Sequence, residues 1–202
     1  MFNSLSQHIA GFLFRQKCFE KNFMPVYVYG IEVLISSLTG VFLVLLAGLA
    51  TGNFINSVIF LVSFIFLRLY TGGLHCNSYI LCNTFTTLSF LIVVLINNAV
   101  YALPESPVVY CGFSVISFLI TLIFAPVSNP NKEVSQNQKY RYRLVSMCIL
   151  ILHFLLYSVF CTYKSAGIIV TTDIIACAYI IIGLIKNKIE RSISDENQKE
   201  HS

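Results

Sequence analysis

The chain has 202 residues, 56% of them hydrophobic and only 11% charged, and its mean hydropathy is +0.77. A soluble domain carries about 25% charged residues, so the charge here is too scarce to cover a water-facing surface. A net charge of +4 at this composition is not typical of a nucleic-acid-binding protein, and we expect no nucleic-acid partner. The seven cysteines are odd in number and mostly lie in apolar runs, which argues against a disulfide framework. We assign neither a cofactor nor a metal site from the sequence.

The first segment, residues 1–24, mixes apolar and basic side chains, among them Phe12, Phe14 and Arg15. This mixture is typical of an amphipathic helix that lies on the membrane surface. We expect Pro25 to end this helix, because proline disrupts a helix interior.

Six apolar segments follow, and each has about the length of a membrane-spanning helix, which needs roughly 20 apolar residues. They are Val26–Ala50, Phe54–Tyr70, Tyr79–Leu103, Val108–Ala125, Leu144–Tyr163 and Gly167–Ile185. Turn-forming residues separate them, and a charged tail follows over residues 186–202. The sequence therefore predicts an all-α integral membrane protein with a single domain over residues 1–202, in which residues 26–185 form a bundle of about six transmembrane helices.

The distribution of basic residues indicates how these segments cross the membrane. With six spans and the N-terminus in the cytoplasm, twelve of the thirteen Lys and Arg residues lie in cytoplasmic segments, and only Lys164 lies outside. Adding or dropping one span destroys this partition. We therefore expect both termini, and the loop between the second and third spans, to face the cytoplasm.

That loop, residues 68–82, brings together a His, two cysteines, a Gly pair and a cation. An imidazole near a thiol can act as its base and favour the nucleophilic thiolate. His75 and Cys82 share a face of a straight helix, but at a rise of about 1.5 Å per residue their backbones lie about 10 Å apart. A Cys–His dyad therefore requires the chain to fold back, which Gly72 and Gly73 permit. Cys82 then lies near the start of the third span, where the helix dipole favours a thiolate.

The residues alone leave other interpretations of this loop open. His75 can be an interfacial histidine, and Cys82 can be a small apolar filler. Cys76 is a rival nucleophile, although a residue adjacent to His75 reaches it only with an awkward backbone.

Two acidic residues lie within the predicted spans, where an unpaired charge is costly. Glu32 lies at a depth similar to that of Arg68 and the loop. It can pair with Arg68 or orient His75 as the third member of a triad. Asp173 lies near the outer side, and we expect it to be structural.

The pattern Arg68-x-x-x-Gly-Gly-x-His75, followed by Ser78 and Cys82, resembles the signature of the AgrB family of membrane cysteine peptidases. Residues 125–132, Ala-Pro-Val-Ser-Asn-Pro-Asn-Lys, resemble that family's turn after its fourth span. The resemblance runs over most of the chain, including the amphipathic N-terminus and the charged cytoplasmic loop. One departure is that Glu133 follows the turn, where some members carry a richer run of basic residues.

The resemblance implies a bacterial multi-pass cell-membrane protein that processes a small precursor peptide, AgrD, for quorum sensing. The family cuts on the C-terminal side of the future signal and produces a cyclic thiolactone or lactone. It also implies that His75 and Cys82 are the catalytic pair of a cysteine endopeptidase. The supporting residues that we assign around this pair are Glu32, Arg68, Gly72, Gly73 and Ser78.

The resemblance also implies how the substrate and a second copy bind. The family's precursors carry acidic tails, so basic residues on the side of the dyad are candidate substrate-binding residues; they are Lys132, Lys139, Arg141 and Arg143. A homodimer fits the resemblance. Small residues in the first span suit close helix contact; they are Gly40, Ala47, Gly48 and Ala50.

Two other classes of function remain open. The first is a membrane transporter or an exporter of a small peptide, with Glu32, Arg68 and Asp173 lining a path. Against it, the sequence shows no inverted repeat and no pair of Gly/Pro-broken helices in matching positions. The second is a membrane partner without enzymatic activity, such as a chaperone or sensor subunit.

Overall fold

The computed structural model describes residues 2–16, 21–73, 78–127 and 135–200, and nearly all of this part of the chain is helical. The long helices are α1 (Phe2–Arg15), α2 (Met24–Ala50), α3 (Phe54–Thr71), α4 (Tyr79–Tyr101), α5 (Ser106–Phe124), α6 (Gln136–Phe160) and α7 (Gly167–Glu200). Two 3-10 turns, η1 (Lys21–Phe23) and η2 (Lys164–Ala166), precede α2 and α7. Within the described residues the only β interaction is an isolated bridge between Gly72 and Val127.

Six of these helices, α2 to α7, are long and apolar enough to cross a membrane. This confirms the predicted all-α membrane protein with six spans. Many of their large apolar side chains are exposed, for example Leu38, Phe42 and Leu95, as expected for surfaces that face lipid. Which end faces the cytoplasm stays a prediction.

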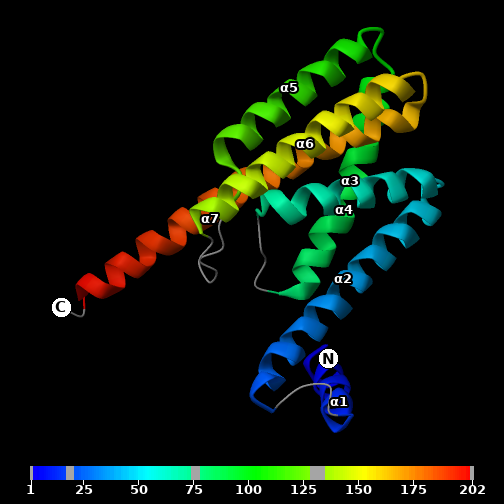
Figure 1. The fold of residues 1–202 in the computed structure, drawn as a ribbon. Coiled ribbons are helices and arrows are strands. Elements are labelled where there is room, and N and C mark those ends of the chain that lie inside the picture. The colour runs from blue at the N-terminus through cyan, green and yellow to red at the C-terminus, as the bar shows by residue number, and fades with distance from the viewer. Residues whose placement is uncertain (1, 17–20, 74–77, 128–134, 201–202) are drawn as a thin grey trace.

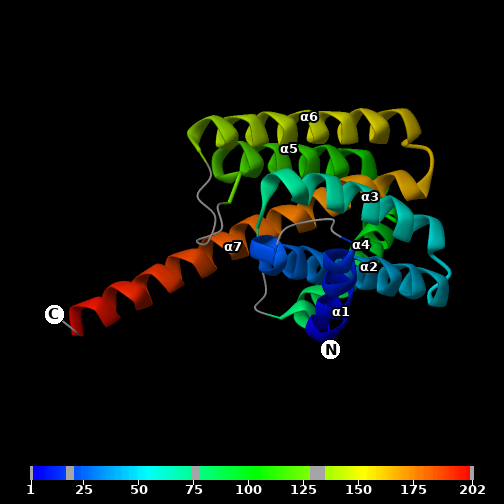
Figure 2. The same ribbon diagram turned by 60° about the horizontal axis from the view of Figure 1, so that its bottom comes forward.

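Helix α7 is the most buried of the six spans: 56% of its most apolar 18-residue stretch is buried inside the protein. It packs against α3, α4, α5 and α6. Helices α5, α6 and the first half of α7 run side by side, while α2 packs against α3 and α4. In both views the C-terminal half of α7 projects from the bundle, and α1 lies against α2 (Figures 1 and 2). Residues on α7 therefore meet side chains from both groups of helices.

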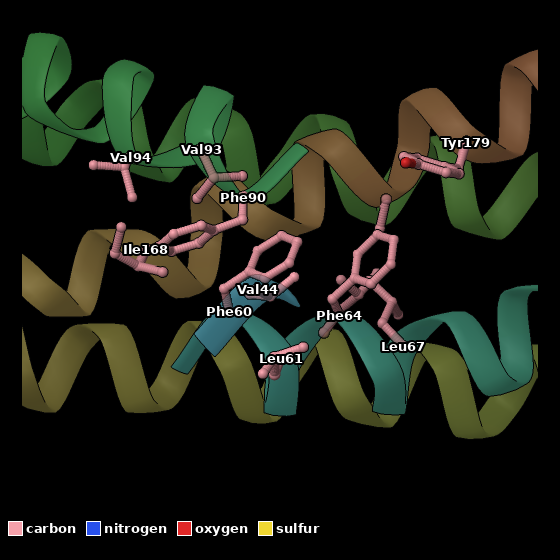
Figure 3. Packing of buried hydrophobic residues seen from close by; sticks show 12 residues of the cluster. Val44, Phe60, Leu61, Phe64, Leu67, Phe90, Val93, Val94, Ile168 and Tyr179 are labelled. Atoms are coloured by element: carbon pink, nitrogen blue, oxygen red, sulfur yellow. The ribbon is translucent and has the colours of Figure 1, made fainter. Parts of the chain in front are cut away.

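The main hydrophobic core lies where α2, α3, α4 and α7 meet (Figure 3). Phe60 and Phe64 of α3 stack with ring centroids 5.2 Å apart, and Phe60 also contacts Phe90 of α4 at 5.6 Å. Phe64 meets the edge of Tyr179 of α7 at 5.4 Å. This aromatic row fixes α3 between α4 and α7, and it ends one helical turn before Arg68.

Three predicted boundaries were wrong. The N-terminal helix ends at Arg15, and Pro25 lies in the first turn of α2, where proline is tolerated because that amide needs no partner. The fifth span begins at Gln136, not Leu144: Ser135 and Gln138 form a capping box. The tail was predicted as a separate charged segment, but α7 continues to Glu200.

The small residues of α2 pack mainly inside the chain. Gly40 is buried against the side chain of Asn83, and an added Cβ would lie 2.8 Å from its Oδ1. Asn83 also donates a hydrogen bond to the Ser36 carbonyl at 3.1 Å. Gly48 is buried against Ser57 of α3. These glycines bring α2 close to α3 and α4, so they are poor grounds for a dimer, and the homodimer stays a prediction.

The helix connections gather at two ends of the bundle. At one end the turn after α3 meets the segment after α5, because the Val127 amide donates to the Thr71 carbonyl at 2.9 Å. At the other end Asn97 of α4 donates to the Lys164 carbonyl at 3.2 Å and accepts from the Tyr110 hydroxyl at 2.7 Å. The first end carries Arg68 and Arg143, and the second carries Lys164.

Candidate functional site

The Gly pair after α3 forms the tight turn that the sequence predicts. Gly72 has φ 68° and Gly73 has φ 122°, values that favour glycine over residues with a Cβ. An added Cβ on Gly72 would lie 2.6 Å from the Val127 carbonyl oxygen, and one on Gly73 would lie 3.0 Å from the Tyr179 carbonyl oxygen. Both glycines are therefore required by backbone conformation and by close approach, and they direct the chain between the Val127 segment and α7.

Arg68 and Cys82 meet across this turn. Arg68 lies in the last turn of α3, where a cation interacts favourably with the helix dipole. Cys82 is the fourth residue of α4, and its amide donates to the carbonyl of Ser78, the N-cap residue, at 3.1 Å. The Nη2 of Arg68 donates to the Sγ of Cys82 at 3.8 Å. Both residues are half-buried, so Cys82 remains partly accessible at this end of the bundle.

Aromatic rings hold the Arg68 guanidinium in place. Its central carbon lies 4.9 Å from the ring centroid of Tyr179 and 5.4 Å from that of Phe64. The hydroxyl of Tyr179 shares a 2.9 Å hydrogen bond with the hydroxyl of Ser89 on α4, and both residues are buried. The sequence did not single out Tyr179 or Ser89, because an aromatic residue within an apolar span has no distinguishing local pattern.

Glu32 of α2 contacts the first turn of the same helix, α4. The hydroxyl of Tyr79, the first residue of α4, donates to Glu32 Oε2 at 3.4 Å. Tyr79 lies three residues before Cys82, so the two side chains share one face of the helix. A hollow of about 570 Å³ adjoins Glu32, lined also by Gln7, Met24, Pro25, Val28 and Tyr29. The role of Glu32 stays a prediction.

The basic residues assigned to the substrate lie at the start of α6. Lys139 and Arg143 are half-buried and Arg141 is exposed. The Nε of Arg143 donates to the Ala125 carbonyl at 2.8 Å, so Arg143 holds the end of α5 against α6. Lys132 lies outside the described residues.

His75 and its neighbour Cys76 also lie outside the described residues. The chain enters their loop from the Gly72–Gly73 turn and leaves it at Ser78, directly before the helix turn that carries Cys82. The described part of the site thus contains a thiol, a guanidinium beside it and a carboxylate on the adjacent helix. Such an arrangement can stabilise negative charge on the sulfur and on an oxyanion formed next to it.

A second polar contact was missed by the sequence reasoning. His153 of α6 and Asp173 of α7 are buried, and their Nδ1 and Oδ1 atoms are 2.8 Å apart. Asp173 was expected to be structural, and this pairing agrees with that expectation. A His and an Asp that lie on different spans gave no local signal of their contact.

Fold and site together define a polytopic membrane protein with a half-buried thiol beside a guanidinium at one end of its helix bundle. Residues 6–192 match the family described as Accessory gene regulator B, and the chain belongs to this AgrB family. Membership supports a role in the agr quorum-sensing system and implies association with the membrane and with an AgrD precursor.

Relatives in clostridia give the same assignment. An AgrB-like protein of Clostridium beijerinckii is 31% identical over 162 residues, which cover 77% of this chain and 78% of that protein. A second AgrB-like protein, from Clostridium perfringens strain 13, is 28% identical over 158 residues, 76% of this chain and 74% of that protein. No solved structure matches the chain.

Proposed function

We propose that this chain is a membrane-embedded cysteine endopeptidase that removes the C-terminal part of an AgrD-like precursor and allows the remaining peptide to cyclise. The observation that carries the proposal is the contact of Arg68 with Cys82 at 3.8 Å in the first turns of α4. A cysteine that only filled space in a membrane helix would have no need of a guanidinium at its sulfur. A positive charge there supports a nucleophilic role, because the reactive form of cysteine is the thiolate.

The first half-reaction forms an acyl-enzyme. His75 takes the proton of the Cys82 thiol, and the thiolate attacks the scissile carbonyl carbon. A negative oxygen develops on that carbon, within reach of the Arg68 guanidinium. When the tetrahedral intermediate collapses, the carbon–nitrogen bond breaks, and His75 returns the proton to the leaving amine. The tail of the precursor departs and the signal segment stays bound to Cys82 as a thioester.

The second half-reaction closes the ring. A Cys thiol or Ser hydroxyl of the precursor attacks the thioester, its proton passes to His75, and Cys82 is released as the thiol. Exchange of a thioester for a thiolactone is nearly isoenergetic, so the outcome depends on which nucleophile is held close and on the exclusion of water. The half-buried position of Cys82 beside Arg68 supports partial exclusion of water from the thioester.

The site faces the cytoplasm in this proposal, where the precursor is made. Arg68, Lys139 and Arg141 would then lie on one side of the membrane with the catalytic residues. Lys139 and Arg141 near the start of α6 attract an acidic precursor tail over about 8–10 Å at physiological salt. Reaction of a cysteine introduced at Lys139 with an impermeant reagent added to intact cells from outside would overturn this orientation.

The test of the function is cleavage of a purified precursor by the protein in nanodiscs. Peptide release that depends on Cys82, together with a thioester adduct at Cys82 seen by mass spectrometry, supports the endopeptidase. Transport of a small peptide that persists in Cys82→Ala, without any cleavage by the wild type, would instead favour an exporter. Mass measurement of the active particle tests the homodimer: cleavage by particles that contain one copy each would exclude it as a requirement.

A further inference from the structure

We propose that Tyr179 of α7 positions Arg68 against Cys82, an inference that rests on the proposed function of Cys82 as the nucleophile. Arg68 and Cys82 belong to α3 and α4, which the Gly72–Gly73 turn and the following loop connect. Tyr179 comes from α7, about a hundred residues further along the chain. It contacts the site in three independent ways, and each constrains a different part of it.

The ring of Tyr179 holds the guanidinium. The central carbon of Arg68 lies 4.9 Å from the ring centroid, within the distance at which the face of an aromatic ring attracts a cation. Phe64 lies on the same guanidinium at 5.4 Å, and its ring meets Tyr179 edge-on (Figure 3). Arg68 is long and flexible, and an arginine at a helix end has many accessible rotamers. Two rings restrict it to the rotamer in which Nη2 reaches the sulfur.

The hydroxyl of Tyr179 fixes the ring. Its 2.9 Å hydrogen bond with Ser89 ties α7 to the helix that carries Cys82. Ser89 lies seven residues after Cys82, two turns along α4, and therefore on the same face of that helix. Tyr179 is 7% exposed, so its ring is held by packing as well as by this bond.

The backbone of Tyr179 supports the loop. Its carbonyl oxygen lies 3.0 Å from the position of a Cβ on Gly73, so the Gly turn rests on α7 at this residue. One residue of α7 therefore contacts the turn, the cation and the helix of the nucleophile. An ordinary core tyrosine needs no such combination, and we assign Tyr179 a positioning role. It does not touch the reacting atoms.

The experiment measures the positive charge beside Cys82 without any precursor. Iodoacetate is anionic and iodoacetamide is neutral, and both alkylate a thiol. The measured ratio is the rate of Cys82 alkylation by iodoacetate divided by the rate by iodoacetamide, quantified by peptide mass spectrometry on the full chain in nanodiscs. A positive charge beside the sulfur raises this ratio, while changes in accessibility affect both reagents and cancel. Arg68→Gln calibrates the ratio for a missing charge, with an expected decrease of roughly 3- to 10-fold for a partly exposed cation.

Tyr179→Leu removes the ring face, and Tyr179→Met fills a similar space with a flexible side chain if the leucine variant does not fold. Either variant should lower the ratio nearly as much as Arg68→Gln. Tyr179→Phe loses the bond to Ser89 but keeps the ring, which packing still holds, so the ratio should stay within about twofold of wild type. Tyr157→Leu is the matched control, because Tyr157 is a buried tyrosine on α6 that packs on Tyr110 with ring centroids 5.1 Å apart, away from Arg68.

A second measurement separates positioning from substrate binding. In precursor cleavage, Tyr179→Leu or Tyr179→Met should lower kcat roughly 10-fold and leave KM within about twofold, because a misplaced Arg68 affects the developing charge more than the bound precursor. A wild-type alkylation ratio in the folded leucine or methionine variant would overturn the inference, and so would an equal decrease in Tyr157→Leu. Cleavage that survives Cys82→Ala would overturn the endopeptidase instead, and the alkylation ratio would still decide the role of Tyr179.

Discussion

Two of the polar contacts between helices in the described residues differ in exposure. His153 and Asp173 join α6 to α7, and their side chains are only 8% and 3% exposed. Arg68 and Cys82 join α3 to α4 at one end of the bundle, and both are half-buried. The first contact satisfies its two members with each other and leaves no access for a substrate. The second leaves the sulfur reachable and relies on aromatic rings to hold the cation.

This difference in exposure distinguishes a contact that stabilises helix packing from one that can take part in catalysis. A buried acid in a membrane helix must be paired or neutral, and a pair that is closed on all sides contributes only to helix packing. A nucleophile must stay accessible, so its partners cannot enclose it. The two sites should therefore respond in opposite ways to mutation: variants at the Cys82 end should lose activity and keep stability, while variants of the His153 pair should lose stability first.

The largest expected effect is the loss of the nucleophile or its base. Cys82→Ala and His75→Ala should each reduce precursor cleavage by at least about 1,000-fold, because members of a catalytic unit are not individually replaceable. Cys82→Ser should lose most activity too, since a hydroxyl is far less acidic than a thiol. Membrane insertion and melting temperature should not change.

Two matched cysteine variants control this measurement. Cys148→Ala removes an exposed cysteine of α6, and Cys76→Ala removes the rival nucleophile of the loop. Both should cleave normally. Full activity in Cys82→Ala together with an inactive Cys76→Ala would show that the wrong cysteine was assigned.

The His153–Asp173 pair should give the largest effect on stability. His153→Ala leaves a buried carboxylate without its partner, and we expect the free energy of unfolding to fall by about 3 kcal/mol. This is the low end of the range for a broken buried pair, because in a membrane the unfolded chain finds other partners for the freed group.

The double variant His153→Leu/Asp173→Leu should recover much of that loss, since apolar side chains can replace a buried pair. Denaturation in mixed micelles measures both variants, and cleavage should be reported per folded molecule. If His153→Ala keeps its stability but loses cleavage, the pair belongs to the function, and the contrast between the two contacts is wrong.

The span pattern was predictable because the hydrophobic length and the placement of basic residues are local properties of the sequence. The start of α6 was missed because Lys139, Arg141 and Arg143 lower the hydropathy of its first turns. The Ser135-x-x-Gln138 capping box was the signal that could have placed it. The positive φ of Gly72 and Gly73 followed from the residue type. The contacts of Tyr179 with Arg68, and of His153 with Asp173, depend on how helices far apart in the sequence rotate against one another, and no local pattern encodes that.

Substitutions of Arg68 test whether the guanidinium beside Cys82 contributes to catalysis. Arg68→Gln should lower kcat by about 10- to 100-fold, the range for losing one group that stabilises a developing oxyanion. Arg68→Lys should recover little, because an ammonium cannot reproduce the planar contact with the rings of Phe64 and Tyr179. Single-turnover cleavage in nanodiscs gives kcat directly. A fully active lysine variant would mean that charge alone is required and that the ring contacts are incidental.

Reversal of Lys139 and Arg141 should have a smaller effect, confined to binding. Exposed ion pairs contribute at most about 1 kcal/mol each, so Lys139→Glu/Arg141→Glu should raise KM by roughly 5- to 10-fold and leave kcat nearly unchanged. Arg143 is left intact because its bond to the Ala125 carbonyl holds α5 against α6. Added salt should raise the KM of the wild type and have little effect on the variant. An unchanged KM would reduce these residues to a signal for membrane orientation.

The smallest expected effect is that of substituting Glu32, which belongs to neither of the two contacts compared above. Its carboxylate accepts from the Tyr79 hydroxyl at 3.4 Å, a long bond, and it adjoins a hollow beside α1 and α2. Glu32→Gln keeps the volume and the acceptor but removes the charge. If Glu32 orients the base, cleavage should slow by about 2- to 5-fold with normal expression, because the hydrogen bond persists in the variant. Tyr79→Phe removes the hydrogen bond itself and keeps the Glu32 charge, so it is the complementary variant. If both variants cleave at the wild-type rate, Glu32 contributes to packing only, and the functional end of the molecule is limited to the α3–α4 turn and the residues of α7 beneath it.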